Sequence, residues 1–142
     1  MSTRTNTRIL RIEWGDCDPA GIVFYPRYFA FFDASTALLF EHVLAVRKAE
    51  MIAKYGFVGF PMVDTRARFV TPCSFGDDVT IESELAEFRR SSFDVRHHVL
   101  KDGALAVEGF ETRVWVGRHP DDPHRIKSQP IPAEVVQRFG GA

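Results

Sequence analysis

The stretch from Pro26 to about Arg47 constrains the fold more than any other part of this 142-residue chain. It contains no glycine, and its only proline stands where the first turn of a helix tolerates one. Apolar side chains occupy nearly every face of the helix that this stretch would form. Such a helix is buried on most sides, and Asp33 and Glu41 interrupt it too often for a membrane span. We therefore expect one long helix at the centre of a domain.

Segments in which apolar and polar residues alternate flank this helix on both sides, as is typical of half-buried strands. The expected elements are strands at 8–14, 62–70, 79–89, 93–99 and 104–116, and short helices at 48–54 and 132–139. Residues 119–130 are expected to form a flexible polar tail. This order predicts an α+β domain in which an antiparallel sheet curls around the central helix. We expect one domain over residues 1–142, with its core at about 8–117 and a C-terminal tail at 118–142.

The composition excludes several classes of partner. Eighteen basic residues against 19 acidic ones give a net charge of −1, which does not favour nucleic-acid binding through bulk charge. Two cysteines, Cys17 and Cys73, are too few for a disulfide framework and fit a reducing compartment. The polar N-terminus has no apolar segment typical of a signal peptide. We expect a cytoplasmic protein that binds neither nucleic acid nor a membrane.

Residues 15–26, with the sequence GDCDPAGIVFYP, form the strongest candidate site. Asp16 and Asp18 lie in a glycine-flanked loop that leads directly into the start of the long helix. Free backbone N–H groups and the positive end of the helix dipole can polarise a carbonyl there. A neighbouring carboxylate could then act as a nucleophile or as a general base. On pattern alone, however, aspartates before a helix are more often turn or capping residues.

The same segment resembles the signature of the 4-hydroxybenzoyl-CoA thioesterase family, a hotdog-fold family of acyl-CoA thioesterases. The resemblance is carried by residues 15–34, 72–79 and 87–97, and it covers most of residues 8–116. It implies the hotdog fold, in which an antiparallel sheet surrounds one long central helix. That fold agrees with the order of elements predicted from periodicity.

The resemblance also implies a mechanism. Asp18 matches the catalytic carboxylate of the family, and Tyr25 stands where the family uses a backbone N–H to polarise the thioester carbonyl. Asp18 would attack the carbonyl carbon or activate a water, and the motif does not separate these two routes. Because a thiolate is a good leaving group, we expect no metal and no cofactor, coenzyme A being part of the substrate.

The predicted substrate-binding residues are Asp33, Tyr28 and Phe29. Asp33 could accept a hydrogen bond from a substrate hydroxyl, or it could pair with Arg27 or another basic residue. Many relatives carry histidine where this chain has Pro26, and the Tyr-Pro variant favours an aromatic, benzoyl-type acyl group.

Arg89, Arg90 and Ser91 fall at the predicted turn between two strands. Adjacent guanidinium groups suit phosphate oxygens, and the resemblance implies that this turn holds the nucleotide of coenzyme A. A solvated hairpin end is the commoner role for such an arginine pair.

The leading hypothesis is therefore a thioesterase for aromatic, 4-hydroxybenzoyl-type acyl-CoA. The alternatives are a thioesterase for aliphatic acyl-CoA or acyl-carrier protein, and a non-catalytic hotdog module that binds acyl-CoA. The resemblance and the exposed sheet edges together predict a homo-oligomer, either a dimer or a tetramer built as a dimer of dimers, with the active site at the dimer interface.

Overall fold

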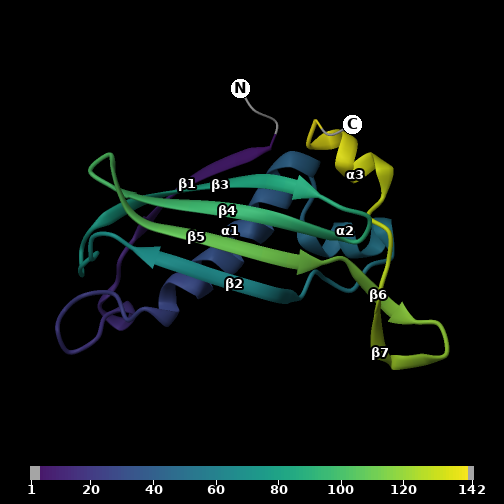
Figure 1. The fold of residues 1–142 in the computed structure, drawn as a ribbon, viewed down its shortest axis with the longest axis horizontal. Helices are drawn as coiled ribbons and strands as arrows, with labels where there is room; N and C mark the ends of the chain where they lie inside the picture. The colour runs from purple at the N-terminus through teal and green to yellow at the C-terminus, as the bar shows by residue number, and fades with distance from the viewer. Residues whose placement is uncertain (1–3, 141–142) are drawn as a thin grey trace.

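The computed structural model describes residues 4–140 and shows one long helix lying against one face of a curved sheet (Figure 1). Its elements are β1 (Thr5–Arg11), a 3-10 turn (Trp14–Asp16), α1 (Pro26–Leu44), α2 (Lys48–Tyr55), β2 (Met62–Phe69), β3 (Asp78–Phe88), β4 (Ser92–Lys101), β5 (Ala104–Val114), β6 (Val116–His119), β7 (Asp122–Ser128) and α3 (Ala133–Arg138).

Five antiparallel strands form the main sheet in the order β1-β3-β4-β5-β2, so β1 and β2 are its two edges. Along β3, alternate residues such as Val79, Ile81 and Leu85 are buried, because successive side chains of a strand point to opposite faces. These side chains pack with buried residues of α1. The helix crosses the inner face of the sheet (Figure 1). This is the arrangement that the resemblance implies.

Two clusters of buried side chains fill the space between α1 and the sheet. One contains Phe32 together with residues of β3, β4 and β5, and it lies towards the start of the helix. The other contains Phe40, Trp115 and Phe139, and it lies towards the end of the helix, under α2 and α3. Residues beyond 117 therefore contribute to the core through α3.

The structure differs from the expected elements in two places after residue 100. The strand expected at 104–116 divides at Trp115, whose backbone N–H donates to the carbonyl of Ser91 instead of continuing the β5 ladder. The segment expected as a flexible tail forms β7, which pairs with β6 in a separate hairpin. Its side chains are mostly exposed, so no apolar alternation marks it in the sequence.

The long helix is shorter than expected, since Leu44 is its last residue and Ala45 takes a left-handed conformation with a φ of 57°. Within residues 4–140, no single helix has the length and apolar character needed to cross a membrane. Only α1 and α2 taken together meet that criterion, and they are bent by 65° relative to each other.

Candidate active site

Residues 15–25, the motif loop, form a tight turn that is pinned to the sheet. The backbone N–H of Asp18 donates to the carbonyl of Ile22 at 2.9 Å, and Gly21 donates back to Asp18 at 2.9 Å. Gly21 has a φ of 82°, a conformation that residues with a Cβ rarely adopt. The N–H of Val23 donates to the carbonyl of Cys73, which anchors the loop beside the turn before β3.

The two aspartates of the motif loop have different surroundings. The carboxylate of Asp16 accepts from the N–H of Glu13 at 2.9 Å, so it caps the 3-10 turn. The carboxylate of Asp18 accepts from the N–H of Ala20 at 2.8 Å, in the manner of an Asx turn. Asp18 forms no ion pair with any residue in the described range 4–140. Asp16 is therefore a structural residue of the loop, whereas Asp18 keeps acceptor capacity for another group.

The start of α1 leaves one backbone donor open. Pro26 has no N–H, the N–H of Phe24 donates to Asp16, and those of Arg27 and Tyr28 donate to carbonyls one turn back. No acceptor for the Tyr25 N–H exists among the residues that the structure describes. An open N–H at the positive end of a helix can polarise a carbonyl oxygen.

A cavity of about 310 Å³ lies beside this helix start. It is lined by Ile22, Val23, Tyr25, Tyr28, Phe69, Val70, Thr71 and Pro72. The ring of Phe69 lies 6.4 Å from that of Tyr25 and 5.7 Å from that of Tyr28. Burial and the neighbouring Cys73 thiol raise the pKa of Tyr28, so its hydroxyl stays protonated at neutral pH. The cavity offers an aromatic, uncharged wall next to the open N–H.

Two of the predicted substrate-binding residues lie outside this cavity lining. Phe29 is partly buried, and its ring meets that of Phe32 edge-on at 6.4 Å. Asp33 lies on an exposed face of α1, with its side chain 70% accessible, and its carboxylate pairs with Arg113 at 2.8 Å. Within one chain, Asp33 thus has the basic partner that was one of its two expected roles. That partner is Arg113 and not Arg27.

Arg113 belongs to a buried polar network that sequence reasoning missed. Its guanidinium donates to both carboxylate oxygens of Glu111, at 3.0 and 2.9 Å, and Glu111 in turn accepts from Thr36 of α1. The Nε2 of His97 lies 3.2 Å from the Thr36 hydroxyl, and its Nδ1 lies 2.7 Å from that of Ser83. A charged residue at an inward position of a strand is the one signal that could have revealed the network.

The predicted nucleotide-binding residues form the turn between β3 and β4, with Ser91 at its tip. The guanidinium of Arg89 already donates to two carboxylates. Asp94 accepts from it at 2.6 and 3.1 Å, and Glu87 accepts from it at 3.1 Å. The exposed side chain of Arg90 has no partner within residues 4–140. In a single chain this turn lies at the opposite end of the sheet from the motif loop (Figure 1).

Comparison with known proteins places this geometry in a family. The model of the thioesterase-like superfamily matches residues 12–139. A 4-hydroxybenzoyl-CoA thioesterase from Pseudomonas sp. (strain CBS-3) is 35% identical over 139 residues, which cover 94% of this chain and 96% of that enzyme. An acyl-CoA thioester hydrolase from Escherichia coli O157:H7 is 23% identical over 131 residues, 92% of each chain.

Solved structures of thioesterases have the same fold as this chain. The 4-hydroxybenzoyl-CoA thioesterase of the same Pseudomonas strain superimposes with a TM-score of 0.85 at 36% identity, covering 95% of this chain and 99% of its own. A gentisyl-coenzyme A thioesterase, BH1999, superimposes with a TM-score of 0.80 at 32% identity, covering 96% of this chain and 100% of its own. The chain has the hotdog fold, and its sequence is similar to these thioesterases along almost its whole length. It therefore belongs to the thioesterase-like superfamily and is an acyl-CoA thioester hydrolase.

Proposed function

We propose that the protein hydrolyses the thioester of an aromatic, 4-hydroxybenzoyl-type acyl-CoA to the free acid and coenzyme A. The observation that carries the proposal is that one loop contains two groups able to act on a thioester. The carboxylate of Asp18 has spare acceptor capacity, and the Tyr25 N–H at the start of α1 is open. The aromatic cavity beside them suits a flat acyl group. The Pseudomonas relative named for this substrate supports the same choice.

In the proposed reaction, the thioester oxygen accepts from the Tyr25 N–H, and the helix dipole stabilises the negative charge that develops on it. Asp18 attacks the carbonyl carbon and forms an anhydride as the coenzyme A thiolate leaves. Water then hydrolyses the anhydride and restores the carboxylate. In the alternative route Asp18 takes a proton from the water that attacks directly. We propose that neither route requires a metal or a cofactor, because the thiolate leaves without Lewis-acid assistance.

A second copy of the chain completes the site. The edge strand β2 exposes the apolar side chains of Val63 and Phe69, which are 60% and 49% accessible, and Val70 directly after it is 53% accessible. Such an edge favours pairing with another strand. If two copies of β2 pair antiparallel about their midpoint, Phe69 lies opposite the partner's Met62. This pairing makes one continuous ten-stranded sheet and brings the second copy to the mouth of the cavity.

The same pairing supplies the substrate-binding groups that one chain keeps apart. Met62 and Arg113 are neighbours in the sheet, so the partner's Arg113 and the partner's Asp33 approach the cavity with the partner's Met62. The partner's Asp33 can then accept a hydrogen bond from a hydroxyl on the ring. Tyr28 forms the wall that the ring packs against, with Phe29 supporting that wall from the core.

In this antiparallel pairing, the partner's sheet runs in the opposite direction to that of the first chain. The turn formed by the partner's Arg89, Arg90 and Ser91 then lies at the same end as the motif loop. We assign the coenzyme A phosphates to this turn, with Arg90 as the open guanidinium and Arg89 held by Asp94.

A panel of acyl-CoA thioesters, followed with a thiol-detecting reagent, tests the function. We expect the highest kcat/KM for 4-hydroxybenzoyl-CoA, with benzoyl-CoA, which has no hydroxyl, clearly poorer. A preference for aliphatic acyl-CoA or for acyl-carrier-protein thioesters would contradict the proposed substrate. Binding without any thiol release would favour the non-catalytic alternative.

Mixing two inactive variants tests the shared site. Asp18→Asn removes the carboxylate of one chain, and Arg90→Glu repels the phosphates that are bound by the partner. A hybrid dimer contains one site with both defects and one site with neither, so mixing should restore part of the activity. If both groups serve a site within one chain, the mixture will stay as inactive as its components.

A further inference from the structure

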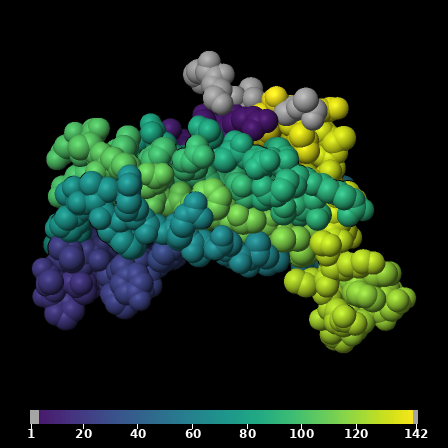
Figure 2. All heavy atoms as spheres, in the orientation of Figure 1, coloured from purple at the N-terminus to yellow at the C-terminus, as the bar shows by residue number. Residues whose placement is uncertain are grey.

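The β2 edge is recessed between two projections of the molecule, the motif loop at one end and the β6–β7 hairpin at the other (Figure 2). In the paired dimer proposed above, the two chains are antiparallel along this edge. The motif loop of one chain therefore lies beside the β6–β7 hairpin of its partner. The groups next to that hairpin come close to the cavity at Tyr25 and Tyr28.

A second cavity, of about 330 Å³, lies beside the hairpin, and we call it the hairpin cavity. It is lined by Lys48, Val58, Gly59, Phe60, Pro61, Arg113, Val116 and Ile126. The ring of Phe60 lies 5.0 Å from that of Phe40 in α1. The hairpin cavity is therefore on the side of the sheet that carries α1, as is the cavity at Tyr28.

Within one chain the two cavities are at opposite ends of β2. Phe69, the last residue of the strand, lines the cavity at Tyr28, and Pro61, directly before the strand, lines the hairpin cavity. The strand spans about 23 Å, which is further than an aromatic acyl group reaches. In the paired dimer Phe69 lies opposite the partner's Met62, so the far edge of an acyl ring bound at Tyr28 faces the partner's hairpin cavity.

Lys48 is the uncommitted cation of the hairpin cavity. Its half-buried ammonium lies 4.8 Å from the centre of the Phe60 ring and forms no ion pair with any residue between 4 and 140. Glu41 accepts from the backbone N–H of Lys48 at 3.3 Å. Lys48 is also the first residue of α2, where the positive end of the helix dipole disfavours a cation. The stability of α2 therefore does not account for this charge.

The other cation of the hairpin cavity, Arg113, is already committed. Its Nε donates to Glu111, its Nη1 to the carbonyl of Phe60 at 3.1 Å, and its Nη2 to Asp33 and Glu111. Around Phe60 the chain thus presents one carboxylate acceptor, Asp33, and one free donor, Lys48. A hydroxyl has one hydrogen to donate and two lone pairs to accept with, so a single hydroxyl can satisfy both.

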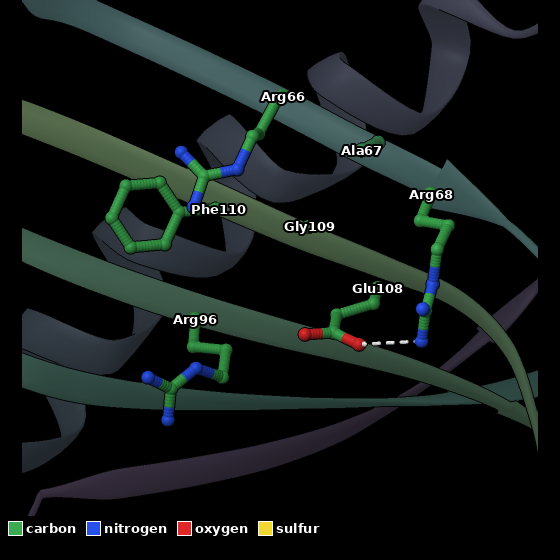
Figure 3. Close-up of a pocket in the computed structure, with 7 residues that line it drawn as sticks. All are labelled: Arg66, Ala67, Arg68, Arg96, Glu108, Gly109 and Phe110. Atoms are coloured by element: carbon green, nitrogen blue, oxygen red, sulfur yellow. Dashed lines mark hydrogen bonds and ion pairs between the residues drawn. The ribbon is translucent and has the colours of Figure 1, made fainter.

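The arginines of the outer sheet face are the competing cations. They surround a hollow of about 480 Å³ on the side of the sheet away from α1 (Figure 3). Arg66 lies over the ring of Phe110 at 4.2 Å, and Arg68 pairs with Glu108 at 3.4 Å. The sheet separates this hollow from both cavities, so its arginines do not reach an acyl ring bound at Tyr28.

We propose that the partner's Lys48 is a specificity-determining residue of this thioesterase. Its ammonium donates to the oxygen of a hydroxyl on the far edge of the acyl ring, and the same hydroxyl donates to the partner's Asp33. This inference rests on the proposed function and on the β2 pairing, and it narrows the substrate class. The ring carries a substituent that both donates and accepts, as a hydroxyl does, whereas an aromatic amino group donates but accepts poorly.

Lys48→Met tests the assignment, because it keeps an apolar stem and removes the ammonium. We expect kcat/KM for 4-hydroxybenzoyl-CoA to fall about tenfold or more, since a charge-assisted hydrogen bond is lost. The value for benzoyl-CoA should change by less than about twofold. The preference for 4-hydroxybenzoyl-CoA over 4-aminobenzoyl-CoA should shrink as well. Lys48→Arg, which keeps a cationic donor, should recover part of the loss.

Lys54→Met is the matched control. Lys54 belongs to the same helix, but its ammonium is exposed and donates to Glu134 at 3.1 Å. This variant should have the kinetics of the wild type on all three substrates. Equal losses of Lys48→Met on the three substrates, or no loss on any, would refute the role of Lys48 and leave the proposed function standing. A wild type that hydrolyses no aromatic acyl-CoA would overturn both.

Hybrid dimers of Asp18→Asn and Lys48→Met test whether the lysine acts across the interface. In a hybrid, the one site with an intact Asp18 also receives the intact Lys48 of the other chain. A co-expressed mixture should therefore hydrolyse 4-hydroxybenzoyl-CoA faster than the Lys48→Met homodimer at the same total chain concentration. If Lys48 serves the site of its own chain, the mixture will be slower than that homodimer, which would overturn the assignment to the partner.

Discussion

Two carboxylates beside the same helix have opposite surroundings. Glu111 is 1% accessible and is surrounded by Thr36, His97 and Arg113, all within hydrogen-bonding distance. Asp18 accepts one hydrogen bond, from a backbone N–H of its own loop, and pairs with no described cation. A carboxylate whose acceptor capacity is filled connects α1 to the sheet, whereas one with capacity to spare can act on a substrate. The comparison distinguishes Glu111, which holds the fold together, from Asp18, to which we assign the proposed chemistry.

Asp18→Asn should have the largest effect on activity. The asparagine side chain keeps an oxygen for the Ala20 N–H, so the loop should retain its shape while the nucleophile or base is lost. We expect kcat for 4-hydroxybenzoyl-CoA to fall by about 10³-fold or more. Asp16→Asn, which likewise keeps its capping oxygen, is the matched control and should lose far less. Steady-state kinetics on both variants provides the measurement.

Arg113→Met should have the largest effect on stability. It leaves the buried carboxylate of Glu111 without its cation, and breaking a buried ion pair typically costs about 3–5 kcal/mol. Urea unfolding followed by circular dichroism should show this loss. Arg66→Met on the outer sheet face loses only an exposed stacking contact with the ring of Phe110, so it should change the free energy of unfolding by about 1 kcal/mol or less. If Arg113→Met lowers the free energy of unfolding no more than Arg66→Met does, the buried network does not stabilise the fold.

Gly109→Ala should have an intermediate effect. A Cβ at this position would lie 2.4 Å from the ring of Phe32, which stacks on His97 and cannot move freely. Overpacking of this kind typically costs about 1–3 kcal/mol. Adding Phe32→Leu should recover part of the loss. Gly59→Ala, where a Cβ meets nothing within 4 Å, is the control and should unfold close to the wild type.

The smallest effect concerns pH. Burial alone would raise the pKa of Glu111, but hydrogen bonds with His97 and Arg113 outweigh burial and hold that pKa below its ordinary value. Its contribution to stability is therefore complete above an unfolded pKa of about 4.3 and is lost as the pH falls through the lower folded pKa. Unfolding midpoints measured from pH 6 to 3 should decline, and Glu111→Gln should flatten the decline. An unchanged slope in Glu111→Gln would assign acid sensitivity to other groups.

Much of the fold could be predicted because the periodicities of its elements are strong. The apolar residues around Phe32 and Phe40 required a buried helix, and the alternation along β3 required a half-buried strand. The β6–β7 hairpin could not be predicted, since its exposed side chains carry no alternation. The break at Trp115 depends on a contact with Ser91 that is distant in the sequence.

The candidate site could be predicted only where it is local. Asp18 and Tyr25 lie in one loop, so the sequence places them together. The sequence indicates that Asp33 needs a basic partner but does not identify it. That partner, Arg113, is 80 residues away, and no local pattern links the two. Arg90 lies at the opposite end of the sheet from the motif loop, so it reaches this site only in the proposed dimer. Contacts made by tertiary and quaternary structure are therefore those that sequence reasoning leaves open.

The most direct test of this account measures kcat and the free energy of unfolding together on Asp18→Asn and Arg113→Met. The account predicts that Asp18→Asn loses about 10³-fold in kcat while unfolding like the wild type. It predicts that Arg113→Met loses about 3–5 kcal/mol of stability. Hydrolysis by Asp18→Asn within about threefold of the wild-type rate would contradict the assignment of the chemistry to this carboxylate.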